Sequence, residues 1–222
     1  MPTLVARQAR TLETQKRLMW AMEKLSVEKG PDNVNVNELI QEAGQKNGSA
    51  LQYHFKSKEG LLAAIHRSRF SQTQAKRRKM LTESLAKNNA LSLRDLCHLV
   101  VGPTFQLCKS DSGHRQWVNA WGAKNAAIAR PTLEEETVDK GNSLQIIKKL
   151  LKESLPHLDD SMFEDRYLNV VRFLNLSMSN QTREKAGFIG KKADLFLSNL
   201  VDMIWGLFMS EVSDETKAYL DK

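Results

Sequence analysis

The spacing of apolar residues is the feature that most limits how this chain can fold. Between residues 12 and 30, the apolar positions that recur at helical intervals are Leu18, Ala21, Met22 and Leu25. The β-branched residues are scattered along the chain, and no Asn-Gly or Asp-Gly pair separates alternating apolar runs. The sequence therefore predicts an all-α fold.

Short helices separated by turn residues follow the first helix. Asn35 is placed to cap a second helix with Glu38 as its capping-box partner, and Gly44 is placed to end that helix. A third short helix is expected over residues 47–55, and a long fourth helix starts from Ser57. Two short helices joined by a tight turn and braced by another helix form the helix-turn-helix arrangement. We therefore expect a helix-turn-helix domain over residues 1–62.

The basic charge of the chain is concentrated in its first third. The 222 residues include 33 Lys and Arg against 26 Asp and Glu, a net charge of +7. Residues 1–80 hold 15 of the basic and 7 of the acidic side chains, which leaves 18 and 19 for the remainder. This asymmetry is typical of a nucleic-acid-binding part joined to a neutral part, although an acidic protein or an anionic membrane surface would also fit.

Three pieces of sequence after the first helix form a specific pattern. They are Val36-Asn-Glu-Leu-Ile-Gln-Glu-Ala-Gly44, Leu51-Gln-Tyr-His-Phe55 and Lys56-Ser-Lys-Glu-Gly-Leu-Leu62. In this order they resemble the tetracycline-repressor (TetR) family of transcriptional regulators, over roughly residues 12–65. The resemblance implies a DNA-binding domain followed by a helical ligand-binding and dimerisation domain, here residues 63–222. The chain departs from the family in one extra residue between Gly44 and Tyr53, and in Gln52, where the family commonly has an aromatic residue.

The candidate DNA contacts follow from the resemblance and from the chemistry of the side chains. A recognition helix must present short polar side chains to base edges, and lysines beside the start of the fourth helix can bind phosphate together with free backbone amides. Arg7 and Arg10 are expected in a flexible basic arm that reaches along the minor groove or stays disordered. His54 is either a DNA contact or a residue that packs on its own domain. The expected set is Arg7, Arg10, Asn35, Lys46, Asn47, Ser49, Gln52, Tyr53, His54, Lys56 and Lys58.

The C-terminal two thirds of the chain contain large apolar side chains that either line a ligand pocket or form an ordinary core. The candidate pocket residues are Phe105, His114, Trp117, Trp121, Asn125, Phe173 and Met178. The last long helix is apolar on more than one side, which predicts one partner inside the chain and one outside it. Together with the segment 162–179 it is expected to form a homodimer interface, through Phe196, Leu200, Met203, Ile204, Leu207 and Phe208.

Several other patterns carry weaker expectations. The run at residues 76–79 is interpreted as a solvated face or an interdomain set of ion pairs, with a nucleic-acid patch as the alternative. Cys97 and Cys108 are expected to be buried thiols, with a redox sensor as the alternative. The run Glu134–Glu136 with Asp139 fits the first turn of a helix, where anions are favoured, although it could also bind a hard cation.

Neither an enzyme nor a metal or cofactor site is expected. The sequence lacks the Gly-x-Ser-x-Gly, Gly-x-x-x-x-Gly-Lys and Gly-x-Gly-x-x-Gly motifs, and it has no His-x-x-x-His or Cys-x-x-Cys pair. The first ten residues lack the apolar core of a signal peptide, and the longest apolar run, residues 204–209, is too short to span a membrane. A cytoplasmic location is therefore expected.

These observations predict a homodimeric, sequence-specific transcriptional regulator. The predicted activity is repression from a pseudo-palindromic operator, relieved when a small-molecule effector binds among the C-terminal helices. The alternative is a helical ligand-binding or protein-interaction module whose basic N-terminal part docks on an acidic partner.

Overall fold

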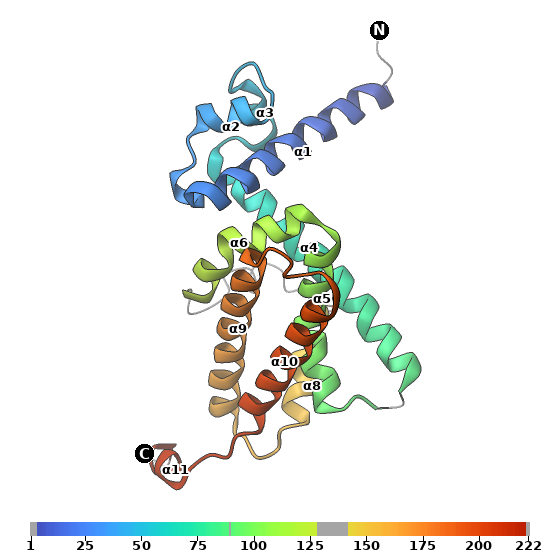
Figure 1. Ribbon diagram of the computed structural model, residues 1–222, viewed down its shortest axis with the longest axis vertical. Coiled ribbons are helices and arrows are strands. Elements are labelled where there is room, and N and C mark those ends of the chain that lie inside the picture. The colour runs from blue at the N-terminus through green and yellow to red at the C-terminus, as the bar shows by residue number, and fades with distance from the viewer. Residues whose placement is uncertain (1–3, 89, 128–141, 221–222) are drawn as a thin grey trace.

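Helices form all the regular secondary structure in the part of the chain that the computed structural model describes, residues 4–88, 90–127 and 142–220. The prediction of an all-α fold is confirmed. Figure 1 shows α1–α3 at one end of the molecule and α4 leading from them into a bundle of longer helices. The elements are α1 (Leu4–Lys29), the short 3-10 helix η1 (Pro31–Asn33), α2 (Val36–Glu42), α3 (Ser49–Phe55), α4 (Lys58–Lys87), α5 (Leu93–Ser110), α6 (Ser112–Ala127), α8 (Ser143–Glu153), α9 (Asp160–Arg183), α10 (Gly190–Met209) and α11 (Asp214–Leu220).

The first helix is longer than its apolar pattern predicts. The pattern starts near Leu18, whereas α1 begins at Leu4. Arg7 and Arg10 therefore lie inside a helix, and the prediction of a flexible arm is wrong. Residues 4–17 are rich in Ala, Leu, Arg, Gln and Glu, which have high helix propensity, and extending a helix already held by the core costs much less than starting one.

The junction between α3 and α4 is tightly built. Lys56 ends α3 with a backbone φ of 69°, and the Ser57 side chain caps α4 by accepting a hydrogen bond from the Gly60 amide at 3.1 Å. A Cβ atom at Gly60 would lie 1.9 Å from the carbonyl oxygen of Phe55. Glycine is therefore required at residue 60, because the end of α3 passes directly against the first turn of α4.

The structure has two hydrophobic cores, and α4 contributes to both. The N-terminal core joins α1–α3 to the start of α4, and it includes Leu18, Met22, Leu39, Leu51, Leu61 and Ile65. Ile65 belongs to this core although it lies three residues beyond the expected domain boundary. The larger core joins α5, α8, α9 and α10, and Leu81 of α4 packs in it. Trp117 of α6 packs against both cores, so α6 is the bridge between them.

The bundle positions α6 between the two ends of the molecule. One side of α6 packs on α1 and the other on α9, while α10 packs against α5 and α9. Asp111 separates α5 from α6. Within the described ranges, no helix combines the length and the apolar character that crossing a bilayer would require.

Candidate nucleic-acid interface

The outer face of α3 carries polar side chains that are open to solvent. Ser49, Gln52 and Tyr53 are exposed, and their spacing of three and four residues puts them on the same side of the helix. Leu51 is buried in the N-terminal core on the opposite side, where Phe55 also packs. In the described part of the chain, the side chain of Gln52 makes no hydrogen bond, so its amide is available to an external partner.

Two asparagines predicted as DNA contacts have structural roles. Asn35 accepts a hydrogen bond from the amide of Asn37 at 2.8 Å and caps α2. Asn47 accepts one from the amide of Ser49 at 3.1 Å, and it also contacts the Ser49 hydroxyl. Both asparagines are exposed, but their oxygens are already used to start the two helices of the helix-turn-helix.

The basic and aromatic candidates around α3 fall into two groups. Lys58 turns back into its own domain and donates to the carbonyl oxygens of Asp32 at 2.9 Å and Val34 at 2.7 Å. Its ammonium therefore joins the start of α4 to the turn before α2. His54 is half-buried, and its ring contacts that of Tyr53, with the ring centroids 4.8 Å apart. By contrast Arg10, Lys46 and Lys56 are exposed.

The short helix α3 has an exposed polar face, and α1, α2 and the start of α4 pack against its other side. This arrangement is that of a helix-turn-helix DNA-binding domain. Residues 21–65 match the model of a family described as bacterial regulatory proteins, tetR family. Residues 21–65 therefore form a TetR-family helix-turn-helix domain, and this domain indicates a DNA-binding transcription regulator. No curated protein matches the chain.

A cavity of about 100 Å³ lies in the helical bundle, and it contains part of the predicted pocket. Its lining comes from α4, α5, α6, α8 and α9, and consists of Phe70, Thr73, Arg77, Thr104, Trp117, Val118, Gly122, Asn125, Leu144, Leu174, Asn175 and Met178. Of the predicted pocket residues, Trp117, Asn125 and Met178 line this cavity. The walls are mainly apolar, and hydroxyl and amide groups of α4, α5, α6 and α9 interrupt them.

The other predicted pocket residues do not line this cavity. Phe105 packs in the large core with its ring tilted against that of Phe188, the ring centroids 5.4 Å apart, and Phe173 packs against the same core. His114 and Trp121 lie on the side of α6 that faces the DNA-binding domain. There the rings of Trp121 and His66 form a T-shaped contact, with their centroids 5.3 Å apart. His114, Trp117, Trp121 and Asn125 share α6, but α6 packs on α1 as well as on α9, so they do not all line the cavity.

His114 is a fully buried histidine in the described structure, and both of its ring nitrogens lack a hydrogen-bond partner there. The centroid of its ring lies 5.3 Å from that of the Trp117 ring. Burial, together with the nearby charge of Arg69, lowers the pKa of His114 to about 4. The imidazole is therefore neutral at physiological pH.

Sequence reasoning missed the burial of Arg77. This residue belongs to the run at 76–79 that was expected to be solvated or to form ion pairs, yet its side chain is buried. Its Nε donates to the carbonyl oxygen of Leu99 at 3.2 Å, and one Nη donates to Gln74 at the same distance. Arg77 is spaced eight residues from Arg69, and the i, i+4 series that connects them is the signal that could have indicated a shared buried face.

The two cysteines are buried and free, as expected. Both lie in α5, and burial raises the pKa of the Cys97 and Cys108 thiols to about 12. A thiol with such a pKa is almost entirely protonated and unreactive at neutral pH. The acidic run Glu134–Glu136 and Asp139 lie outside the described residues. Elsewhere in the described chain, no three His, Cys, Asp or Glu side chains are grouped as metal ligands.

The predicted dimer interface on α10 is corrected in part. Leu200, Ile204 and Phe208 are fully buried in the core of their own chain, so they cannot contact a partner. Met203 and Leu207 are exposed, and Phe196 is only partly buried. The second apolar stripe of α10, formed by Phe196, Met203 and Leu207, therefore remains as the predicted dimer surface.

Proposed function

We propose that the protein binds a pseudo-palindromic DNA operator as a homodimer and represses transcription until a small-molecule effector releases it. The observation that carries the proposal is the exposed polar face of α3, formed by Ser49, Gln52 and Tyr53. An amide such as that of Gln52 can pair with the N6 and N7 atoms of adenine in the major groove. Lys46 and Lys56 flank this face and supply the positive charge that phosphates require.

The second apolar stripe of α10 supports the dimer. Large apolar side chains at the surface of a folded chain favour association, and Leu176 of α9 adds to the exposed apolar area of these two helices. A two-fold interface uses the same surface on both subunits, so it presents two copies of α3 in opposite orientations. Two recognition helices related in this way match the two halves of a pseudo-palindrome.

The cavity beside Trp117 and Asn125 supports the effector site. It lies between α4, which begins in the DNA-binding domain, and α9, which belongs to the bundle. A molecule that fits the cavity better when α4 and α6 move apart would favour that conformation and weaken operator binding. The small volume of about 100 Å³ means that either a very small molecule binds or the helices separate on binding.

Selection from random duplex DNA tests the proposal. We expect the wild-type protein to enrich one pseudo-palindrome, and we expect Gln52→Ala and Tyr53→Ala to reduce binding to it. Gln145→Ala is the matched control, because Gln145 is an exposed glutamine on α8, far from α3. The proposal fails if no pseudo-palindrome is enriched, or if the α3 variants bind as the control does.

The same experiment separates the proposal from docking on an acidic partner. Both kinds of binding weaken as salt rises, so salt dependence does not distinguish them. A preference for one DNA sequence over another at fixed salt is expected only of the operator-binding protein.

A further inference from the structure

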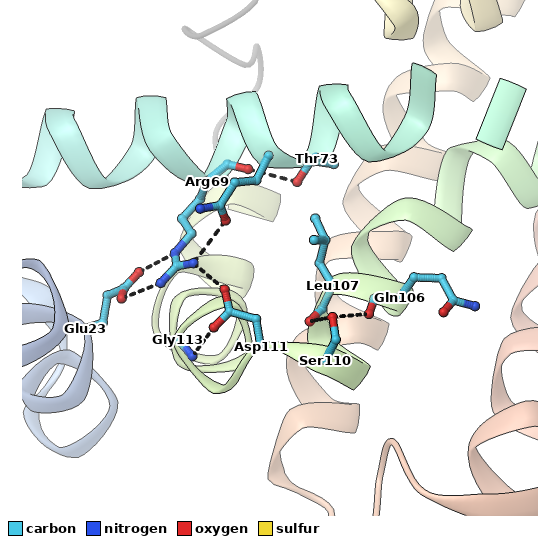
Figure 2. Close-up of polar contacts among 9 residues, drawn as sticks. Glu23, Arg69, Thr73, Gln106, Leu107, Ser110, Asp111 and Gly113 are labelled. Atoms are coloured by element: carbon cyan, nitrogen blue, oxygen red, sulfur yellow. Dashed lines mark hydrogen bonds and ion pairs between the residues drawn. The ribbon is translucent and has the colours of Figure 1, made fainter. Parts of the chain in front are cut away.

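Three charged side chains connect the DNA-binding domain to the bundle, and we call Glu23, Arg69 and Asp111 the polar joint. Figure 2 shows the Arg69 side chain extending from α4 between Glu23 of α1 and Asp111 at the start of α6. Arg69 donates from Nε and Nη2 to the two carboxylate oxygens of Glu23, each at 2.7 Å. Its Nη1 donates to Asp111 Oδ2, also at 2.7 Å. One guanidinium therefore holds three helices at once.

The joint is restrained in orientation as well as in distance. The pair with Glu23 is bidentate, which fixes the plane of the guanidinium, and Glu23 has only 1% of its side chain exposed. Asp111 is held independently, because its Oδ1 accepts from the amide of Gly113 at 2.8 Å at the start of α6. A Cβ atom at Gly113 would lie 2.3 Å from Arg69 Nη2. The first turn of α6 is thus shaped around the guanidinium.

The position of the joint along α4 separates the two cores. The inward-facing positions of α4 recur every four residues through Leu61, Ile65, Arg69, Thr73, Arg77 and Leu81, and all are buried except Arg69, whose side chain is 12% exposed. The first two pack in the N-terminal core and the last packs in the large core. Between them this face of α4 is polar, so the apolar contact that spans the two cores comes from Trp117 of α6 and not from this face of α4. The polar joint occupies the N-terminal part of this interval.

We propose that the polar joint sets the orientation of the DNA-binding domain on the bundle and thereby fixes the half-site spacing that the dimer accepts. This inference rests on the proposed function, since only a dimer on two half-sites has a spacing to recognise. Each base pair added between the half-sites increases their separation by about 3.4 Å and rotates one half-site relative to the other by about one tenth of a turn. A dimer with rigidly held domains cannot follow this change, whereas a dimer with a loosened joint can.

Arg69 and Asp111 are positioning residues in this proposal, so the test measures spacing rather than affinity alone. Asp111→Asn removes the charge that faces Arg69 and retains an oxygen that can cap α6. Affinities are measured for the selected operator and for versions with one or two base pairs added or removed between the half-sites. We expect the wild-type protein to lose about tenfold or more in affinity per base pair of offset, as for a mismatched contact, and we expect the variant to lose about threefold or less.

Glu164→Gln is the matched control, because Glu164 pairs with Lys148 at 2.7 Å between α8 and α9, inside the bundle. It should keep the wild-type spacing profile. If Asp111→Asn does not fold, Arg69→Lys is measured in its place, since a single ammonium cannot reproduce the bidentate pair. The inference is overturned if the joint variant keeps the wild-type profile. If the wild-type protein enriches no pseudo-palindrome, that result instead contradicts the proposed function.

Discussion

The outer face of α3 and the polar joint both consist of polar side chains, yet they differ in solvent exposure and in hydrogen bonding within the protein. Gln52 and Tyr53 are exposed, and Gln52 makes no side-chain hydrogen bond within the described residues. Glu23 and Arg69 are almost fully enclosed, and both carboxylate oxygens of Glu23 accept hydrogen bonds from Arg69. Exposed polar groups without a partner in the protein can form hydrogen bonds with an external binding partner. Polar groups closed on one another hold helices in one arrangement.

The charges of the joint respond differently to their surroundings. Burial raises the pKa of Glu23, and the pairing with Arg69 offsets this only in part. At Asp111 partial burial acts in the same upward direction, but the charge of Arg69 and the amides of His114 and Gly113 together lower its pKa. The joint is therefore a costly arrangement at its α1 end, where burial disfavours the charge of Glu23 and the pairing with Arg69 favours it.

The largest effect is expected from Arg69→Met, which keeps much of the stem and removes the guanidinium. Glu23 then remains buried without its partner, and we expect the free energy of unfolding to fall by about 3–5 kcal/mol. Urea unfolding followed by circular dichroism measures the change. Arg94→Met removes one side of the exposed pair with Asp202 and should cost less than about 1 kcal/mol. Equal losses in the two variants would contradict the distinction between buried and exposed polar groups.

A smaller effect is expected at His114, beside the joint. Its folded-state pKa of about 4 lies below the ordinary 6.5, so the unfolded chain takes up a proton first as pH falls. Stability from this group is complete above about pH 6.5 and is lost as pH falls toward about 4, by at most about 3 kcal/mol. His114→Phe should remove this part of the pH dependence.

Urea unfolding at several pH values between these limits measures the His114 effect. His54→Phe is the control, because His54 is a half-buried histidine on α3, away from the joint. A pH dependence in His114→Phe as steep as in the wild-type protein would show that His114 does not carry it.

The next smaller effect is expected for Gln52→Ala on the exposed face of α3. Removing one amide that pairs with a base should cost about 1–3 kcal/mol of discrimination at one operator position, which we expect to be adenine. Folding stability should change by less than about 0.5 kcal/mol because the side chain is exposed. Replacing that adenine by 7-deazaadenine should weaken the wild-type protein but not the variant. Equal sensitivity of both proteins would exclude Gln52 as the base-reading residue.

The smallest effect is expected for Lys124→Ala, which removes the second polar tie between α6 and the DNA-binding domain. Lys124 donates to both carboxylate oxygens of Asp32 at 2.8 and 2.9 Å, but both side chains are largely exposed. Water and salt screen such a pair, so the midpoint of urea unfolding should match that of the wild-type protein at physiological ionic strength. A loss comparable to that of Arg69→Met would mean that exposure does not distinguish the two ties.

Much of the fold was predictable because its signals are local. The spacing from Leu18 to Leu25 predicted α1, Asn35 and Ser57 predicted the starts of α2 and α4, and Gly44 predicted the end of α2. Each signal acts within about one helical turn, so a short window of sequence contains the whole physical cause. The basic excess and the polar face of α3 were visible for the same reason.

Other features depend on residues that meet only in the folded chain. Arg69 is 46 positions from Glu23 and 42 from Asp111, and no local pattern links them. The choice between the two apolar stripes of α10 was likewise made by α5 and α9, which buried Ile204 and left Met203 exposed. The sequence alone determined where helices begin and which of their faces are apolar or charged. The tertiary structure decided which faces are covered, because burial depends on how separate helices pack.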